Sequence, residues 1–198
     1  MVLTTLGVGA ADSPRYAPAG LLVEAERRRV MFDGGPGSVP GGPLDAWLVT
    51  DAHAELIAAI RILARGLGVE PRMGDLALDG LQIECHPVVH TSHPACGYLI
   101  RWCGHNVVWA PEFFEFPEWA GGADLMFAEA AGWNRPIRFA GGVGGHLDVF
   151  AVAAAARRRG VRRLVFAHIG RPTLRALDHA ERPAFGEFAD DGHVFRLP

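Results

Sequence analysis

The order of apolar runs along this chain is the feature that most restricts its fold. Short strand-like runs, roughly four to eight residues long, alternate with Gly- and Pro-rich segments. Two helix-like repeats occur, one beginning near residue 50 and one near residue 150, and a strand-like run follows the second directly. Many strands in two halves, each half with its own helix, indicate two mixed β-sheets covered by helices on the outside.

The strand-like runs contain most of the apolar residues. Each is short, rich in Val, Leu, Ile and aromatic residues, and bounded by turn-forming residues. The Asp79-Gly80 pair between two such runs is a hairpin signal. The residues that we interpret as strands are 2–9, 21–26, 29–33, 46–50, 76–78, 81–90, 95–102, 106–110, 124–130, 161–168 and 193–197.

Three segments are predicted as helices, namely the two helix-like repeats and a short third run. Gly66 and Gly68 are available to end the first helix, and Gly160 ends the second. A segment with five Gly and three Pro in twelve positions must be a loop. We therefore predict helices over residues 53–67, 146–159 and 172–180, and Gly-rich loops over 34–45 and 132–145.

The composition fits one soluble domain over residues 1–198. With 49% hydrophobic residues the chain can bury a full core. Its net charge of -3 gives no general attraction to nucleic acid or to an anionic membrane. No signal peptide or membrane-spanning run is recognisable. Cys85, Cys96 and Cys103 lack a Cys-x-x-Cys spacing, which favours reduced thiols and a cytoplasmic location.

Residues that can bind a metal ion follow several of the predicted strands. A single histidine at a strand end is most often structural, but polar residues at many strand ends together point to a site. His90 and His93 follow the same strand, and the sequence does not choose between them. The full set is Asp33, Asp51, His53, Glu55, His90, His93, Glu112, His146 and His168.

This order of residues resembles the metallo-β-lactamase fold superfamily over nearly the whole chain. It is most similar to the branch with RNase Z and the phosphoribosyl cyclic phosphodiesterases. The matching segments are a Gly-rich first turn with a hairpin and Asp33-Gly34-Gly35, then "HTSHPACGYLI", "NVVWAPE", "DLMFAEA" and "GGHLDVFAVAAAARRRGVRRLVFAHIGRP". The resemblance implies a four-layer αββα sandwich of two mixed sheets flanked by helices.

The segment "TDAHAEL" stands where this family has Thr-His-x-His-x-Asp-His. Asp51 takes the first histidine position and His53 the second. Glu55 takes the aspartate position, and Leu56 takes the last histidine position. Glu112 replaces an aspartate at a later strand end. Leu56 cannot bind a metal, so the motif is degenerate.

The resemblance implies two metal positions in one pocket. The first would use Asp51, His53 and His90, with Glu112 as a fourth ligand. The second would use Glu55, Glu112 and His168, but it has lost a nitrogen at Leu56. We therefore expect one tightly bound divalent ion at the first position, Zn²⁺ or Mn²⁺ with Fe²⁺ also compatible, and a weak or empty second position.

The implied function is metal-dependent hydrolysis of a small phosphodiester or cyclic phosphate by a metal-activated water. Glu55 would be the general base, and His146, at the start of a helix, the general acid. Arg15 and Arg171 are candidates to pair with a phosphate. Nucleic acid is not expected as a partner, and the sequence leaves a homodimer open. The alternatives are a non-catalytic protein that binds a ligand or partner in the degenerate pocket, and another metal-dependent reaction such as thiol-ester or redox chemistry.

Overall fold

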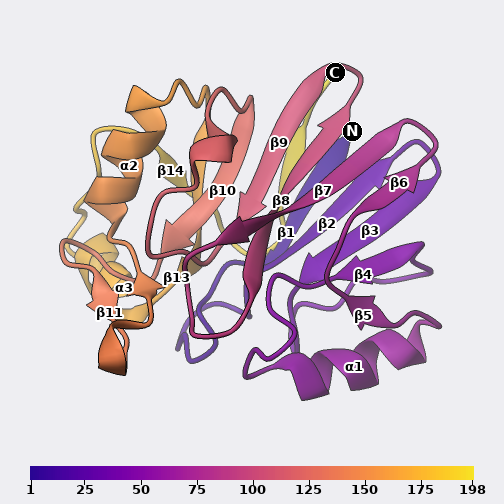
Figure 1. Cartoon of the computed structure of the whole chain (residues 1–198), viewed down its shortest axis with the longest axis horizontal. Helices are drawn as coiled ribbons and strands as arrows, with labels where there is room; N and C mark the ends of the chain where they lie inside the picture. Colours follow the sequence, from indigo (N-terminus) through magenta and orange to yellow (C-terminus); the bar gives the residue numbers. More distant parts are fainter.

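Two mixed β-sheets face each other in the computed structural model, which describes residues 1–198 (Figure 1). The first sheet is antiparallel at one end and parallel where β4 joins β3 and β5. In spatial order it consists of β15 (His193–Arg196), β1 (Val2–Gly7), β2 (Gly20–Ala25), β3 (Arg28–Asp33), β4 (Ala46–Leu48) and β5 (Pro71–Arg72).

The second sheet combines a parallel half with an antiparallel half. Strands β9, β10, β13 and β14 run parallel to their neighbours in that group, and β6 to β9 are antiparallel. Its spatial order is β14 (Glu187–Phe188), β13 (Leu164–Ile169), β10 (Leu125–Ala130), β9 (His105–Ala110), β8 (Ala95–Trp102), β7 (Leu81–Val88) and β6 (Leu76–Leu78).

Alternating side chains decide which face of each strand meets the other sheet. In β3, Phe32 points between the sheets and contacts Tyr98 with ring centroids 5.1 Å apart, whereas Met31 points outward to the helix side. The Tyr98 hydroxyl donates a hydrogen bond of 2.8 Å to the carbonyl of Val49, which ties the two sheets together. The largest hydrophobic cluster therefore fills the space between the sheets.

Helices cover both outer faces, which gives the predicted αββα order of layers. Helix α1 (Ile57–Gly66) places Ile60 and Ala64 in a smaller cluster with Trp47 on the outer face of the first sheet. Helices α2 (Val149–Arg158) and α3 (Arg171–Asp178) lie on the side of the second sheet (Figure 1). None of the helices has the length and apolarity to cross a membrane. Two short 3₁₀ turns, η1 (Glu118–Ala120) and η2 (Ala140–Gly142), complete the structure.

The first helix begins four residues later than the sequence predicts. The Asp51 Oδ1 atom accepts a hydrogen bond of 2.7 Å from the backbone N–H of His53. This side-chain turn competes with helix formation, so residues 51–56 form turns and α1 begins at Ile57.

His146 does not begin a helix, contrary to the prediction. It belongs to β12 (Gly145–His146), which pairs with β11 (Ile137–Arg138) inside the segment predicted as a loop. Helix α2 begins at Val149, and the Asp148 carboxylate caps it by accepting a hydrogen bond from the N–H of Ala151. The helix N-terminus is thus occupied by a carboxylate of the chain itself and offers no site for an anionic substrate next to His146.

Candidate metal-binding active site

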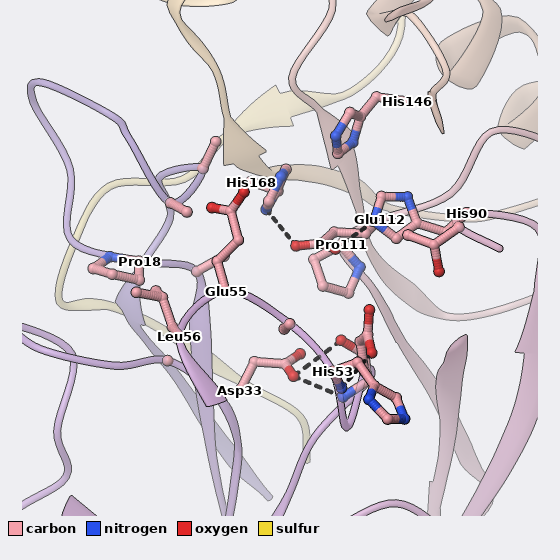
Figure 2. Close-up of a pocket in the computed structure, with 18 of the residues that line it drawn as sticks. Pro18, Asp33, His53, Glu55, Leu56, His90, Pro111, Glu112, His146 and His168 are labelled. Carbon is pink, nitrogen blue, oxygen red and sulfur yellow. Dashed lines mark hydrogen bonds and ion pairs between the residues drawn. The ribbon is translucent and has the colours of Figure 1, made fainter. Parts of the chain in front are cut away.

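The predicted site residues converge on one cavity of about 540 Å³ at the edge of the sandwich. Its lining includes each metal-capable residue that the sequence singles out, so the strand ends do meet (Figure 2). These residues are Asp33, Asp51, His53, Glu55, His90, His93, Glu112, His146 and His168. The same lining contains five acidic residues and no Lys or Arg.

Glu112 lies between two buried histidines. It follows β9, and its Oε2 atom is 2.8 Å from His90 Nε2 while its Oε1 atom is 3.1 Å from His168 Nδ1 (Figure 2). His90 and His168 are only 5% and 7% exposed. Burial alone raises the pKa of Glu112, but its electrostatic interaction with His168 and its hydrogen bond with His90 outweigh burial and lower that pKa overall. Two imidazole nitrogens and a carboxylate therefore converge in a buried place.

The backbone at His168 directs its ring into the cavity. Its φ of 55° lies in the left-handed region, which is uncommon outside glycine. The pairing of β10 with β13 also shifts register here, between Ala128 and Ala130. Such irregularities at strand ends re-aim side chains. Burial lowers the pKa of His168, which favours the neutral imidazole that binds metals.

His90 is held in place by Gly145. The Gly145 N–H donates a 2.8 Å hydrogen bond to the His90 carbonyl, and the Gly145 carbonyl lies 2.9 Å from His90 Nδ1. An N–H at Nδ1 donating to this carbonyl leaves Nε2 as the ligand atom once it loses its proton. Burial lowers the pKa of His90, but the hydrogen bond and charge of Glu112 outweigh it and raise the pKa to about 9.

A second pair, Glu129 and His146, lies beside this group. Glu129 is fully buried at the end of β10, and its Oε2 atom is 2.7 Å from His146 Nδ1. Backbone N–H groups of Phe113 and Ala131 also donate to the Glu129 carboxylate. Burial lowers the pKa of His146, but the charge of Glu129 outweighs it and raises that pKa overall. The ring of His146 stacks on that of His168, with centroids 5.2 Å apart.

Glu129 is the important residue that the sequence reasoning missed. Ligand atoms of Glu129, His146 and His168 all lie within 4.8 Å of one another, so they form a cluster able to hold a metal ion. The available signal was a carboxylate inside the strand 124–130, whose other residues after Asp124 are apolar. A charged residue in such a strand is buried only when it has partners.

Asp51 belongs to a different group, whose two histidines are more exposed than His90 and His168. Its Oδ2 atom is 2.7 Å from His93 Nε2, and the rings of His93 and His53 have centroids 5.0 Å apart. Asp51 is 5% exposed, whereas His53 is exposed. Each of the two histidines that the sequence left open thus has its own carboxylate, Glu112 for His90 and Asp51 for His93.

Glu55 and Leu56 also line the cavity. Glu55 is exposed and points into the cavity on the side of His168 (Figure 2). Leu56, at the position of the family's last histidine, lies over Gly35 and packs with the apolar cluster under α1. An apolar side chain therefore occupies the place where a second nitrogen donor is expected.

Asp33 supports the site from behind. Its Oδ1 atom accepts hydrogen bonds from the N–H and hydroxyl of Thr50, and its Oδ2 atom accepts one of 2.7 Å from Trp109 Nε1. Burial raises the pKa of Asp33 to about 7. These contacts fix the residue that precedes Asp51, which makes Asp33 a positioning residue.

The two arginines considered for phosphate binding lie outside the cavity. Arg15 pairs with Asp178 at 2.6 Å, and Arg171 pairs with Asp12 at 3.1 Å. Both arginines are exposed and neither lines the cavity. They are surface ion pairs.

The αββα sandwich and its buried group of imidazoles and carboxylates define an α/β protein with a candidate metal site at the edge of its sheets. Residues 51–169 match the model of the beta-lactamase superfamily domain, and the chain belongs to this superfamily. No curated protein sequence matches it.

Three solved structures illustrate the fold. The metallo-beta-lactamase fold protein YhfI from Bacillus subtilis has a TM-score of 0.76 and 17% identity, covering 98% of this chain and 99% of that chain. A diphosphatase from the PhnP family has a TM-score of 0.73 and 19% identity, covering 100% and 98%. The short form of human tRNase Z has a TM-score of 0.66 and 14% identity, covering 100% of both chains. The predicted fold and family are confirmed.

Members of this fold family typically depend on divalent metal ions. The residues present here fit such an ion, because buried imidazole nitrogens and carboxylate oxygens point at one another. Mixed nitrogen and oxygen donors suit Zn²⁺, Mn²⁺ and Fe²⁺.

Proposed function

We propose that this protein is a metal-dependent hydrolase that cleaves a small phosphodiester or cyclic phosphate. The observation that carries the proposal is the position of Glu112 between His90 and His168, directly beside the Glu129–His146 pair. A set of metal-binding side chains and a candidate proton donor, His146, which pairs with Glu129, thus lie in one place. Its volume of about 540 Å³ suits a small molecule. Proteins of the same fold include a diphosphatase and tRNase Z, whose substrates contain phosphate.

We propose His90, Glu112 and His168 as the principal ligands of the tightly bound ion, Zn²⁺ or Mn²⁺. The sequence alone assigned that ion to Asp51, His53 and His90, but the carboxylate that contacts His90 is Glu112, and Asp51 contacts His93 instead. The inner donors are supported by their burial and by their mutual contacts. When bound, the ion would lower the pKa of a water ligand towards about 7 and so supply a nucleophile at neutral pH.

His146 is proposed as the general acid. Its Nδ1 atom is held by Glu129, so a proton on Nε2 is free to be donated to a leaving oxygen. The raised pKa of His146 favours this protonated form. The ring lies 4.9 Å from His90 and 5.2 Å from His168, between centroids, so it is next to the proposed metal ligands. Glu129 acts by positioning His146.

Glu55 is proposed as the general base. It is exposed, points into the cavity and has no ion pair. The Asp33 carboxylate, by contrast, is occupied by three hydrogen bonds. Glu55 is therefore the carboxylate best able to take a proton from the attacking water.

The lining of the cavity favours a diester over a monoester. No Lys or Arg faces the substrate, and five acidic residues do. A phosphodiester carries one negative charge, whereas a monoester carries up to two near neutral pH. A cavity lined by acidic residues and by no Lys or Arg therefore discriminates against the more highly charged group, even with an ion bound.

The rival function is a non-catalytic protein that binds a ligand in this cavity. Leu56 supports it, because an apolar side chain replaces a metal-binding histidine and packs against Gly35. Such a protein would keep the cavity but would not turn over a substrate. The buried pairs around Glu112 and Glu129 favour the hydrolase, since unused charges in a buried cavity are costly.

The test is hydrolysis of a panel of nitrophenyl phosphodiesters, cyclic phosphates and matched monoesters, with Zn²⁺ or Mn²⁺ added. We expect diesters to be cleaved faster than monoesters, a chelator to abolish the reaction, and His168→Ala to abolish it together with metal content. His86→Ala is a matched control, because His86 pairs with Glu84 outside the cavity. An inert wild type that contains metal and binds a diester without cleaving it would establish the rival function.

A further inference from the structure

We propose that the cavity contains an apolar subsite, formed around Leu56 and Pro18, which binds an alkyl or aryl group of the substrate. The inference rests on the proposed hydrolase function and narrows its substrate class. The substrate is then an open-chain phosphodiester whose non-leaving ester group is apolar, and Leu56 determines this preference.

Two segments far apart in the sequence supply an apolar wall of the cavity. Pro18 and Ala19 come from the loop that leads into β2, and Ala54 and Leu56 come from the turn that leads into α1. None of these four side chains carries a polar atom. The wall therefore differs in chemistry from the group of imidazoles and carboxylates that we propose as metal ligands and acid–base residues.

Leu56 and Pro18 meet over the backbone of Gly35. A Cβ atom placed on Gly35 would lie 3.2 Å from Leu56 Cδ1 and 3.6 Å from Pro18 Cγ. Leu56 and Pro18 are both only partly buried and both line the cavity, so part of their apolar surface still faces it. Covering such a surface with an apolar group is favourable, and each methylene that is fully buried strengthens binding by up to about four-fold.

The position of His146 decides which ester group reaches this wall. Figure 2 shows Leu56 and Pro18 on one side of the cavity, and His146 and His90 on the other. His146 is the proposed donor of a proton to the leaving oxygen, so the leaving group lies on the side of His146. The group that stays on phosphorus then points towards Leu56. A cyclic phosphate joins its two ester oxygens in one small ring and cannot extend to both sides.

The wall selects an apolar group over a polar or anionic one. A sugar hydroxyl would find no hydrogen-bonding side chain on Leu56, Pro18 or Ala54, and burying it without a partner is costly. A second anionic group would be repelled by the five acidic residues of the lining. A cationic group would be attracted by these residues, but it would lose its hydration against an apolar wall.

The experiment measures, by calorimetry, how the metal-loaded full chain binds the methyl, hexyl and aminopentyl monoesters of methylphosphonic acid. Each ester carries one negative charge and has no leaving oxygen. We expect wild type to bind the hexyl ester about ten times more tightly than the other two, or more, because its added methylenes reach the apolar wall. In hydrolysis, with nitrophenol as the common leaving group, hexyl in place of methyl should lower KM and leave kcat unchanged.

Variants of the wall test which residues cause the preference. Leu56→Asn, and separately Pro18→Ser, should bring the ratio of hexyl to methyl affinity towards one and leave the affinity for the methyl ester unchanged. Leu56→Met keeps an apolar side chain of similar volume and should keep the ratio. Ile62→Asn is the control, because Ile62 lies in α1 outside the cavity and is 70% exposed. Melting curves show that each variant is folded.

Three results would reject the subsite. The first is equal affinity of wild type for the three esters, and the second is tighter binding of the aminopentyl ester than of the hexyl ester. The third is a preference for hexyl that survives in the folded variants of Leu56 and Pro18.

A pair of carboxylates separates the subsite from the proposed function. Heptanoate and acetate carry no phosphate, but they differ by the same kind of alkyl chain. If no phosphonate binds and no diester is cleaved, the proposed function fails. The subsite then stands if heptanoate binds more tightly than acetate and Leu56→Asn removes the difference, and it is rejected if the two carboxylates do not differ.

Discussion

Replacing His146 by Ala tests the assignment of the proton donor. In the proposed reaction His146 protonates only the leaving oxygen, so its removal should slow substrates whose leaving groups need a proton. General acid catalysis of this kind contributes about 10²–10⁴-fold. This loss corresponds to a barrier about 3–5 kcal/mol higher. The bound ion should be unaffected, because we propose His90, Glu112 and His168 as its ligands.

The structure indicates why the effect should approach the upper part of that range for a poor leaving group. His146 Nδ1 is held 2.7 Å from the Glu129 carboxylate, which is fully buried, so the ring is fixed in place. The charge of Glu129 raises the pKa of His146, which favours the protonated ring. No Lys or Arg lines the cavity, so neither of these side chains is available to replace this donor.

The assay compares a series of phosphodiesters, from nitrophenyl to alkyl leaving groups, for wild type and for His146→Ala with equal metal content. The hydrolysis rate of wild type should depend weakly on the leaving group, and that of the variant strongly. The variant should cleave nitrophenyl esters at nearly the wild-type rate. If His146→Ala lost the same fraction of its rate with nitrophenyl and with alkyl esters, His146 would not be the general acid. Loss of the metal in His146→Ala would instead make His146 a ligand, as its cluster with Glu129 and His168 permits.

Three further changes test other parts of the site. Protonated His146, and its stabilising pairing with Glu129, is lost as pH rises through the pKa of His146. Glu129→Gln removes the charge that raises this pKa, so the alkaline limb of the pH–rate profile should move to lower pH. Leu56→His, alone or with Asp51→His, should raise metal affinity beside Glu55, measured by equilibrium dialysis; unchanged affinity would contradict the degenerate-motif interpretation. Gly145 has a φ of 147°, and Gly145→Ala places a Cβ 1.9 Å from the carbonyl oxygen of Ile137, so the melting temperature and metal content of this variant should fall. In the control Gly66→Ala, the new Cβ meets open space in α1, and neither quantity should fall.

Most of the fold could be predicted because apolar patterns follow burial. The run 29–33 became β3, and its alternating faces separate the two hydrophobic clusters that the sandwich requires. The errors occurred where a local hydrogen bond competes with apolar spacing. Asp51 accepts the N–H of His53 and delays α1, and the pairing of His146 with Ile137 builds a strand in place of a helix start. Apolar periodicity carries no information about either contact.

Many of the residues that line the cavity could be predicted, but the contacts between them could not. The sequence places polar residues at strand ends, and those ends meet at one edge. Which histidine meets which carboxylate depends on how two separate sheets align. The bridge between Asp51 and Ala95 brings His93, rather than His90, to Asp51. Glu129 was missed because its importance comes from burial, which a single strand-like run does not reveal.

The charge of the cavity leads to a last prediction, on substrate binding itself. An anionic phosphodiester must enter a space lined by five acidic residues and no Lys or Arg. Only bound cations and protonated histidines can offset that repulsion, so metal removal should weaken binding and not only slow catalysis. Calorimetry with a non-hydrolysable phosphonate analogue measures this directly. We expect the analogue to bind the metal-loaded wild type at least ten times more tightly than the chelated protein or His168→Ala. Equal affinity after chelation would show that the cavity recognises the substrate without a metal, and the link between ion and phosphate would then be wrong.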